Sequence, residues 1–274
     1  MRALKFTVPV NIMNVTTFVC PVLNQLCKTN ILSADEIEAS CKYKNPLDRF
    51  SRLQSHLLKR IIIGYFSGID PSWLIFQSLP KGKPYVVNAP LSFNVTHTRE
   101  YIAISIVPSS SIDIGVDVES LKSIPEEEAY LIASLVLIPE EMTIFLAHEN
   151  PTEYLLQCWT IKESIMKACG LGIYCDPLCL STSRDNAFTS DQVVDRWQVA
   201  TVGVGGNCIL SQSHRAEDSD NSDLQSECYL LNKQFLLSTE NLSYDLAATM
   251  ALDFDTISAY RLSRPFSNKM SSIS

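Results

Sequence analysis

The stretch IDIGVDVE, residues 112–119, alternates apolar and non-apolar positions without a break. Side chains of a β-strand point to opposite faces with a period of two, so a strand here has one apolar and one acidic face. The apolar face holds Ile112, Ile114, Val116 and Val118, and the other face holds Asp113, Gly115, Asp117 and Glu119. Gly115 adds no side-chain bulk, so we expect that a substrate can approach the strand on its acidic face.

The two neighbouring carboxylates Asp117 and Glu119 repel each other, and without a cation one of them tends to stay protonated. A divalent cation held by oxygen ligands removes this conflict, and Mg²⁺ bound by few carboxylates is typical of phosphate chemistry. The alternative is a half-exposed edge strand with a solvated acidic face. Taken alone, the stretch favours that alternative.

A second stretch, CWTIKESIMK, contains Glu163 and Lys167 four residues apart, so both project from one face of a helix, with Trp159 one turn earlier. The alternative is an exposed ion pair, which stabilises a helix by only about 0.3–0.5 kcal/mol. Apolar residues before the pair and the terminating Gly170 indicate a largely buried helix. A glutamate and two lysines on such a helix, Lys162 included, need a partner or a function.

Two further segments carry groups that suit phosphate oxygens. The stretch FNVTHT, residues 93–98, predicts a strand that ends near His97, and upstream Lys81 and Lys83 flank a glycine turn. A structural histidine is the alternative. The other segment is basic, with Asp48 as its only acid, and it predicts either a local anion site or a solvated helix face. Its six cations are Lys42, Lys44, Arg49, Arg52, Lys59 and Arg60.

Composition limits the possible classes of protein. The 274 residues are 46% hydrophobic and 19% charged, which is typical of a globular chain with a sizeable core. The net charge of −8 argues against nucleic acid as the main partner. Nine cysteines without a C-x-x-C pair predict buried thiols in a reducing compartment, so we expect a cytoplasmic protein. No apolar run is long enough to span a membrane, and we expect no signal peptide.

The order of elements predicts an α+β fold with two similar halves, 1–107 and 112–274. Turn residues at 108–111 look like a linker, and the polar, acidic segment 211–227 is expected to be a mobile loop. In the first half we expect strands at 3–20, 85–87, 93–98 and 101–107, and helices after Ser33 and over 45–63. In the second half we expect strands at 112–118, 197–204, 208–211, 229–237 and 247–252, and helices at 126–137, 139–148 and 152–169.

The stretches FNVTHT (93–98), GVDVE (115–119) and WTIKESIMK (159–167) resemble the three signature motifs of the 4'-phosphopantetheinyl transferases. The family pattern is (I/V)-G-(I/V)-D, followed by (W/F)-x-x-K-E-(S/A)-x-x-K, and both parts occur here in order. The resemblance covers about residues 33–180 and points to the larger, pseudo-dimeric type typified by the surfactin-synthetase activator. It implies two halves related by a pseudo-twofold axis, each a small antiparallel sheet packed with helices, in a monomer.

The resemblance also implies the roles of individual residues. Mg²⁺ would be bound by Asp117, Glu119 and Glu163 together with coenzyme A, the co-substrate. Lys167 would stabilise the phosphate, and Glu163, or a water that it orients, would take the proton of a carrier-protein serine. The adenosine phosphates would be held by Arg52, Lys83 and His97, with Arg49 as the alternative to Arg52.

The implied reaction moves 4'-phosphopantetheine from coenzyme A to an apo carrier protein and releases 3',5'-ADP. The chain looks most like a fungal member that activates the aminoadipate reductase of lysine biosynthesis. The alternatives are a broad-range activator of carrier proteins and a catalytically inactive scaffold of the same fold. A magnesium-dependent pyrophosphate hydrolase is a further rival, but such sites usually concentrate several acids on one helix.

Overall fold

The structure is a computed structural model that describes residues 14–23, 30–182, 187–190, 193–215, 226–231 and 258–261. The first part of the chain forms β1 (Val15–Pro21), α1 (Ala34–Cys41), α2 (Pro46–Ser67), the 3-10 helix η1 (Pro71–Trp73), β2 (Phe76–Ser78), β3 (Pro84–Val86), β4 (Ser92–His97) and β5 (Tyr101–Val107). The second part forms β6 (Ile114–Ser120), α3 (Glu126–Val136), α4 (Pro139–Ala147), α5 (Pro151–Ala168), the 3-10 helices η2 (Gly172–Tyr174) and η3 (Pro177–Cys179), β7 (Ala187–Ser190), β8 (Val193–Val204), β9 (Cys208–Arg215), β10 (Ser226–Leu230) and β11 (Ser258–Arg261). None of the described helices is both long and apolar enough to cross a membrane.

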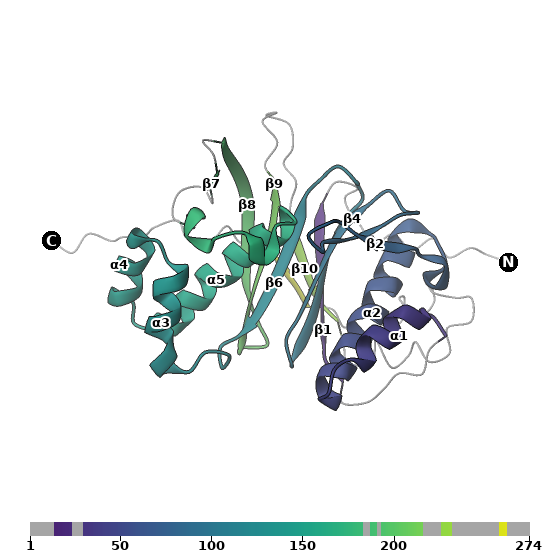
Figure 1. The fold of residues 1–274 in the computed structure, drawn as a ribbon, viewed down its shortest axis with the longest axis horizontal. Helices are drawn as coiled ribbons and strands as arrows, with labels where there is room; N and C mark the ends of the chain where they lie inside the picture. The colour runs from purple at the N-terminus through teal and green to yellow at the C-terminus, as the bar shows by residue number, and fades with distance from the viewer. Residues whose placement is uncertain are drawn as a thin grey trace.

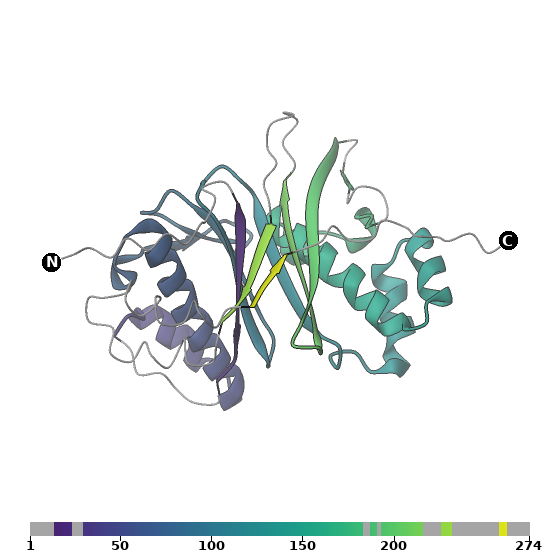
Figure 2. The same ribbon diagram turned by 180° about the vertical axis from the view of Figure 1, so that it is seen from behind.

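The elements form four layers, with two sheets in the middle and helices on both outer sides (Figure 1). One sheet has the strand order β11-β10-β1-β5-β4, and the other has the order β6-β9-β8-β7. Helix α2 covers the outer face of the first sheet, with α1 packed against α2, and α5 covers the outer face of the second sheet (Figure 2). The predicted α+β class is confirmed. The first sheet is not purely antiparallel, because β1 and β10 pair in parallel.

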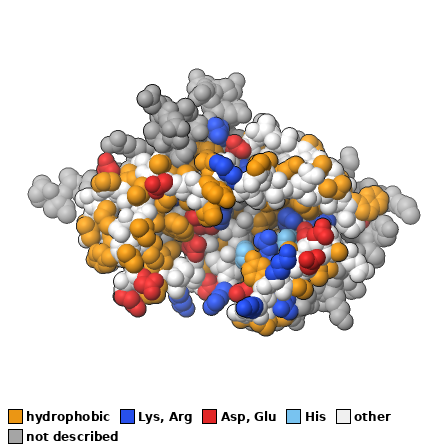
Figure 3. All heavy atoms as spheres, viewed as in Figure 1, with side chains coloured by type: hydrophobic (Ala, Val, Ile, Leu, Met, Phe, Trp, Pro, Cys, Tyr) orange, Lys and Arg blue, Asp and Glu red, His pale blue; other side chains and the backbone are white. Residues whose placement is uncertain are grey.

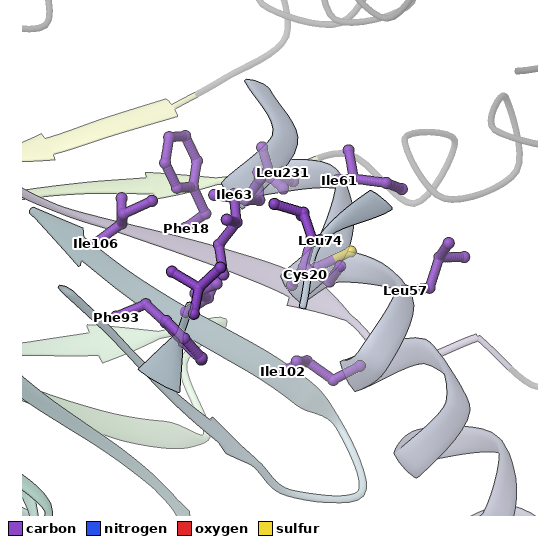
Figure 4. Close-up of a cluster of buried hydrophobic side chains, with 14 of the residues drawn as sticks. Phe18, Cys20, Leu57, Ile61, Ile63, Leu74, Phe93, Ile102, Ile106 and Leu231 are labelled. Carbon is purple, nitrogen blue, oxygen red and sulfur yellow. The ribbon is translucent and has the colours of Figure 1, made fainter. Parts of the chain in front are cut away.

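The largest apolar core lies between α2 and the first sheet. Side chains of α2 such as Leu57 and Ile61 pack against strand side chains such as Phe18, Phe93 and Ile102, as Figure 4 shows. A second cluster fills the space between the sheets; its members include Val19 and Ala103 from one sheet and Val116, Val118 and Leu210 from the other. Burial of apolar surface between the two sheets therefore joins the two halves.

Helices of the first half begin where their capping residues predict. Ser33 and Glu36 form a capping box at α1, and the Asn45 side chain caps α2 with Pro46 in its first turn. The helix α2 runs four residues further than the expected end at residue 63, to Ser67. It stops at Gly68, whose φ of 68° lies in the left-handed region.

Gly115 shows why β6 and α5 lie in direct contact. A Cβ atom on Gly115 would lie 1.9 Å from the carbonyl oxygen of Ser164, so only glycine lets the helix come this close. The expectation that Gly115 leaves room for a substrate is therefore wrong, because the backbone of α5 occupies that space. The predicted apolar face of β6 is confirmed, since Ile114, Val116 and Val118 are all buried.

Several expected boundaries change. The loop expected at 211–227 is wrong at both ends, because 211–215 completes β9 and 226–227 begins β10. Ser211 shows the reason, since its hydroxyl is buried and lies 2.9 Å from those of Thr160 and Thr201. Residues 216–225 of that loop lie outside the described residues, as do residues 3–13, 232–237 and 247–252 of the expected strands. The sequence missed β2, β7 and β11, which are only three or four residues long.

The expected linker at 108–111 is a short turn between β5 and β6. On either side of it Val107 and Ile112 are buried in one apolar cluster with Val15 and Ile114. The first sheet also takes β10 and β11 from beyond residue 225, so both halves of the sequence contribute strands to it. The division of the chain at 107–112 stays a prediction.

Candidate active site

Asp117 lies at the junction of β4, β6 and α5. Its side chain points to the face of β6 that α5 covers, and the residue is only 3% exposed. One oxygen, Oδ1, accepts hydrogen bonds from Lys167 Nζ at 2.5 Å and from Thr96 Oγ1 at 3.1 Å. The Thr96 hydroxyl in turn accepts from Lys167 Nζ at 3.2 Å. The other oxygen, Oδ2, is buried and has no hydrogen-bond partner among the described residues.

Glu119 and Glu163 share this site, as their pKa shifts show. Burial, and then the negative charge of Asp117, raises the pKa of Glu119 to about 7, and Glu163 adds to the shift. Burial also raises the pKa of Glu163, and Asp117 adds to the shift while Lys167 opposes it. The three carboxylates therefore repel one another inside a partly closed site, and Lys167 compensates only part of that charge.

The predicted acidic face of β6 thus lies against α5 and is not a solvated strand surface. The alternative of a simple exposed pair between Glu163 and Lys167 does not describe this helix either. Lys167 reaches across to Asp117, with only 27% of its side chain exposed. The predicted convergence of Asp117, Glu119, Glu163 and Lys167 on one place is what the geometry supports.

His97 ends β4 on the other side of the junction. The residue is exposed, yet the surrounding protein and the positive charges of Arg52 and Lys167 lower its pKa below the ordinary value. A cavity of about 250 Å³ opens beside it. Its walls combine apolar and polar side chains: Val22, Leu23, Tyr43, Leu47, Asp48, Ser51, His97, Thr98 and Arg99. Figure 3 shows histidine, basic and acidic side chains gathered in a hollow near the centre of this face.

The basic segment divides into two groups. Lys59 and Arg60 are buried and paired with Glu36, at 2.9 and 2.6 Å, so they are not part of an anion site. Their predicted role as part of a basic patch, and the alternative of a solvated face, are both wrong for them, because α1 supplies a buried partner. Arg49 donates to the carbonyl oxygen of Tyr43 at 3.1 Å. Arg52 is only partly buried and electrostatically close to His97.

Lys83 directly precedes β3, and its side chain reaches the last residue of α5 and the residue before β6. Its Nζ atom donates to the carbonyl oxygen of Ala168 at 2.5 Å and lies 3.4 Å from Asp113. Burial lowers the pKa of Lys83, and Asp113 opposes the shift. The contacts of Lys83 thus differ from those of His97 and Arg52, and its phosphate-binding role stays a prediction.

Lys162, the other lysine of the motif, has a structural partner. It is fully buried and donates to Glu141 at 2.7 Å and to the carbonyl oxygen of Val136 at 2.6 Å. Glu141 also accepts from the backbone N–H and the hydroxyl of Thr182. This pair fixes α3 and α4 against α5. Lys162 and the adjacent Glu163 therefore serve different faces of one helix.

No group of three or more preassembled metal ligands of the His, Cys, Asp or Glu type is found in the described part of the chain. The site nonetheless fits a divalent cation. Asp117 Oδ2 is buried and finds no partner within the described ranges, and two neighbouring carboxylates have raised pKa values. A hard cation among oxygen ligands would give Asp117 Oδ2 a partner and would offset the repulsion among the carboxylates.

The sequence missed the contribution of β4 to the acidic site. Thr96 touches both Asp117 and Lys167, and the Asn94 side chain accepts a hydrogen bond from Val116 N at 3.1 Å. The alternation of FNVTHT contained this signal. Asn94 and Thr96 are uncharged polar residues on one face of a strand, and such residues need hydrogen-bond partners when they are buried.

Comparison with known proteins defines the class first. Residues 113–199 match the model of the 4'-phosphopantetheinyl transferase superfamily. This segment contains β6 and α5, the two elements that carry Asp117, Glu119, Glu163 and Lys167. This is the family that the sequence motifs resemble, and the matched segment contains two of the three motifs.

Individual relatives refine this result. The chain is 28% identical over 145 residues to a 4'-phosphopantetheinyl transferase of Bacillus subtilis, covering 52% of this chain and 62% of that protein. It is 27% identical over 147 residues to the 4'-phosphopantetheinyl transferase Sfp of Bacillus subtilis strain 168, covering 53% and 62%. It is 27% identical over 160 residues to the L-aminoadipate-semialdehyde dehydrogenase-phosphopantetheinyl transferase of Schizosaccharomyces pombe, covering 54% and 62%. The chain thus spans less than two thirds of the length of these curated relatives, with 62% of each covered.

Proposed function

We propose that this chain transfers the 4'-phosphopantetheine group of coenzyme A to a serine of a carrier protein and releases 3',5'-ADP. The observation that carries the proposal is the buried Asp117 carboxylate, which has one oxygen on Lys167 and the other without a partner in the described part of the chain. Two more carboxylates carry charge close to it, and a cavity opens beside His97, the residue that follows Thr96 in β4. A diphosphate between two organic groups matches this combination of acids, a cation-binding position and a lysine.

Mg²⁺ fits the acidic side of the site and would be held by Asp117, Glu119 and Glu163. When bound, it would neutralise charge on the diphosphate oxygens. Lys167 would stabilise the negative charge that grows on the leaving 3',5'-ADP. Phosphoryl-group transfer of this kind needs positioning and charge neutralisation, and it requires no protein nucleophile.

We assign to Glu163 the role of the base that accepts the proton of the carrier serine. The serine oxygen forms a bond to the pantetheine-side phosphorus, the bond from that phosphorus to the bridging oxygen breaks, and the proton moves to the Glu163 carboxylate. Burial raises the pKa of Glu163 above its ordinary value. A carboxylate with a raised pKa is a better proton acceptor near neutral pH than an ordinary glutamate.

The cavity beside His97 is where we place the adenosine end of coenzyme A. Apolar walls such as Leu23 and Tyr43 suit an aromatic base, and His97 and Arg99 suit phosphate oxygens. Arg52 is our first candidate for the 3'-phosphate because its charge acts on His97. Arg49, the alternative, already donates to a backbone carbonyl.

For the physiological carrier we propose the aminoadipate reductase of lysine biosynthesis. The Schizosaccharomyces pombe relative bears the name of that enzyme's activator, and this supports the choice. A broad-range activity is the second candidate, since the names of the bacterial relatives specify no particular carrier. A monomer in a reducing, cytoplasmic compartment completes the proposal.

A panel of apo carriers tests the function directly. The purified chain is incubated with coenzyme A, Mg²⁺ and one apo carrier at a time, from aminoadipate reductase and from fatty-acid, polyketide and peptide synthases. We expect intact-mass spectrometry to show addition of one phosphopantetheine, fastest on the reductase carrier. Equal rates on all carriers would favour the broad-range activator. No gain on any carrier would contradict the transferase and favour an inactive scaffold.

A further inference from the structure

The strands β4 and β6 lie in contact but belong to different sheets. The strand β4 ends the five-stranded sheet, and β6 begins the four-stranded one. The two strands lie in contact, yet no backbone ladder joins them in the described part of the chain. β6 therefore turns a backbone group toward β4, the N–H of Val116, that a neighbouring strand would normally satisfy.

Asn94 satisfies this group. Its side-chain oxygen accepts a hydrogen bond from the backbone N–H of Val116 at 3.1 Å. Both residues are buried, with Asn94 4% exposed and Val116 fully covered. A buried N–H that loses its acceptor is costly, because no water can reach it.

The contact is placed directly beside the acidic site. Val116 precedes Asp117 in β6, and Asn94 lies two residues before Thr96, on the same face of β4. Thr96 donates to Asp117 Oδ1 at 3.1 Å. Two consecutive residues of β6 are thus held by two side chains of β4, one through its backbone and one through its carboxylate.

The last residue of β4, His97, lies at the cavity on the other side of the junction. One short strand therefore carries both the groups that hold Asp117 and a wall of the cavity. Any shift of β6 along β4 would change the separation between the acidic site and that cavity.

We propose that Asn94 is a positioning residue for the acidic site. Through Val116 N–H it fixes β6 against β4, so that Asp117 faces Lys167 and stands at the correct distance from the cavity at His97. This inference rests on the proposed function, in which one substrate spans both sites.

The test compares Asn94→Leu, which removes the acceptor but keeps the number and branching of side-chain heavy atoms, with Asn14→Leu. Asn14 is an equally buried asparagine at 3% exposure, and it donates to Glu227 at 2.9 Å within the first sheet. Asn94→Asp keeps an acceptor oxygen at the same position. Three quantities are measured: amide hydrogen exchange of residues 114–120 without metal, Mg²⁺ affinity by titration calorimetry, and kcat and KM for coenzyme A.

We expect Asn94→Leu to speed exchange at Val116 and Asp117, to weaken Mg²⁺ binding, and to lower kcat by roughly tenfold to a hundredfold. Asn14→Leu should lower the melting temperature while leaving Mg²⁺ affinity and kcat near the wild-type values. Asn94→Asp should restore slow exchange at Val116. If Asn94→Leu does not fold, Asn94→Thr makes the same test, because threonine suits a strand and its hydroxyl is too short to reach Val116 N.

Asn94→Leu behaving like Asn14→Leu in exchange and in Mg²⁺ affinity would overturn the positioning role. The exchange measurement needs no substrate and no metal. A wild-type protein that transfers nothing would therefore contradict the proposed function, while the exchange result would still decide whether Asn94 holds β6.

Discussion

Asp117 combines two features that rarely occur together in one carboxylate. One oxygen is tied to Lys167 and Thr96, and the other is buried with no partner among the residues that the structure describes. The first interaction fixes the orientation of the side chain, and the second leaves an acceptor for a ligand. A single residue therefore joins the structural and the proposed chemical parts of the site.

Replacing Asp117 with asparagine should separate these parts. The Asp117→Asn side chain keeps the shape and can still accept from Lys167, but it has lost the charge that binds a cation, so we expect transfer to fall by at least about a hundredfold. Intact-mass assays of an apo carrier measure the rate, and circular dichroism checks the fold. Asp113→Asn is the matched control, because Asp113 is partly exposed and paired with Lys83 and Arg215. Equal rates for Asp117→Asn and wild type would refute the role of Asp117.

Glu119 should make Mg²⁺ binding depend on pH near neutrality. Its pKa is raised to about 7, so protons compete with the metal below that pH, and affinity should fall by up to about tenfold per pH unit. Without metal the sign for stability is opposite. A raised folded-state pKa stabilises the fold at low pH, and this contribution is lost as the pH rises from about 4.5 through 7.

Glu119→Gln removes both effects. We expect the variant to show a flatter dependence of Mg²⁺ affinity on pH by calorimetry. We also compare melting temperatures without metal. The difference between the variant and the wild type, in favour of the variant, should be larger at about pH 8 than at about pH 5. Parallel pH profiles for the two proteins would contradict the raised pKa of Glu119.

At the scale of residues, sequence pattern located the acidic site well and the buried ion pairs badly. Alternation in β6 and helical spacing in α5 carry direct geometric information on Asp117 and Glu163. Charge alone carries no information on its partner. Lys59 looked like a candidate for anion binding and Lys162 like a lysine in need of a function, yet each is paired with a glutamate from another helix.

Among the elements, the contact of β6 with α5 sets the position of every residue assigned to catalysis. Gly115 permits this contact, since a Cβ there would overlap the Ser164 carbonyl. The sequence placed both elements but not their packing. A glycine in a strand signals a close approach, and it does not identify the approaching group.

Gly115→Ala should push α5 away from β6. We expect a loss of about 1–3 kcal/mol in the free energy of unfolding. We also expect a large fall in transfer rate, because a displaced α5 carries both Glu163 and Lys167 away from Asp117. Gly203→Ala in β8 is the control, since a Cβ there meets nothing within 4 Å. Chemical denaturation measures both variants. The same unfolding free energy for Gly115→Ala and Gly203→Ala would contradict the close contact.

Across the whole molecule, the two halves complete each other. The first sheet needs β10 beside β1, and Cys228 and Leu231 are buried with residues of the first half. Composition and element order predicted two halves of this size. They did not predict that strands from the end of the described chain return to the first sheet, because strand pairing over such distances leaves no local pattern.

An isolated fragment of residues 1–107 should therefore not fold. Without β10, strand β1 would expose an unpaired edge. Without β6 and β9, the apolar face of the first sheet that carries Val19 and Ala103 would be exposed to water. We expect poor dispersion in its proton NMR spectrum, and recovery of native shifts when the fragment 112–274 is added. A well-dispersed spectrum of the fragment alone would show that the first half is an independent domain.

The parallel pair of β1 and β10 also has a consequence for synthesis on the ribosome. Val15 pairs with Ser226, so β1 waits for a partner strand that is translated 211 residues later. Contacts this distant in sequence slow folding, because a long loop must close before they form. The nascent chain therefore presents an open strand edge until β10 has been translated, which makes it a natural client for chaperones that shield such edges.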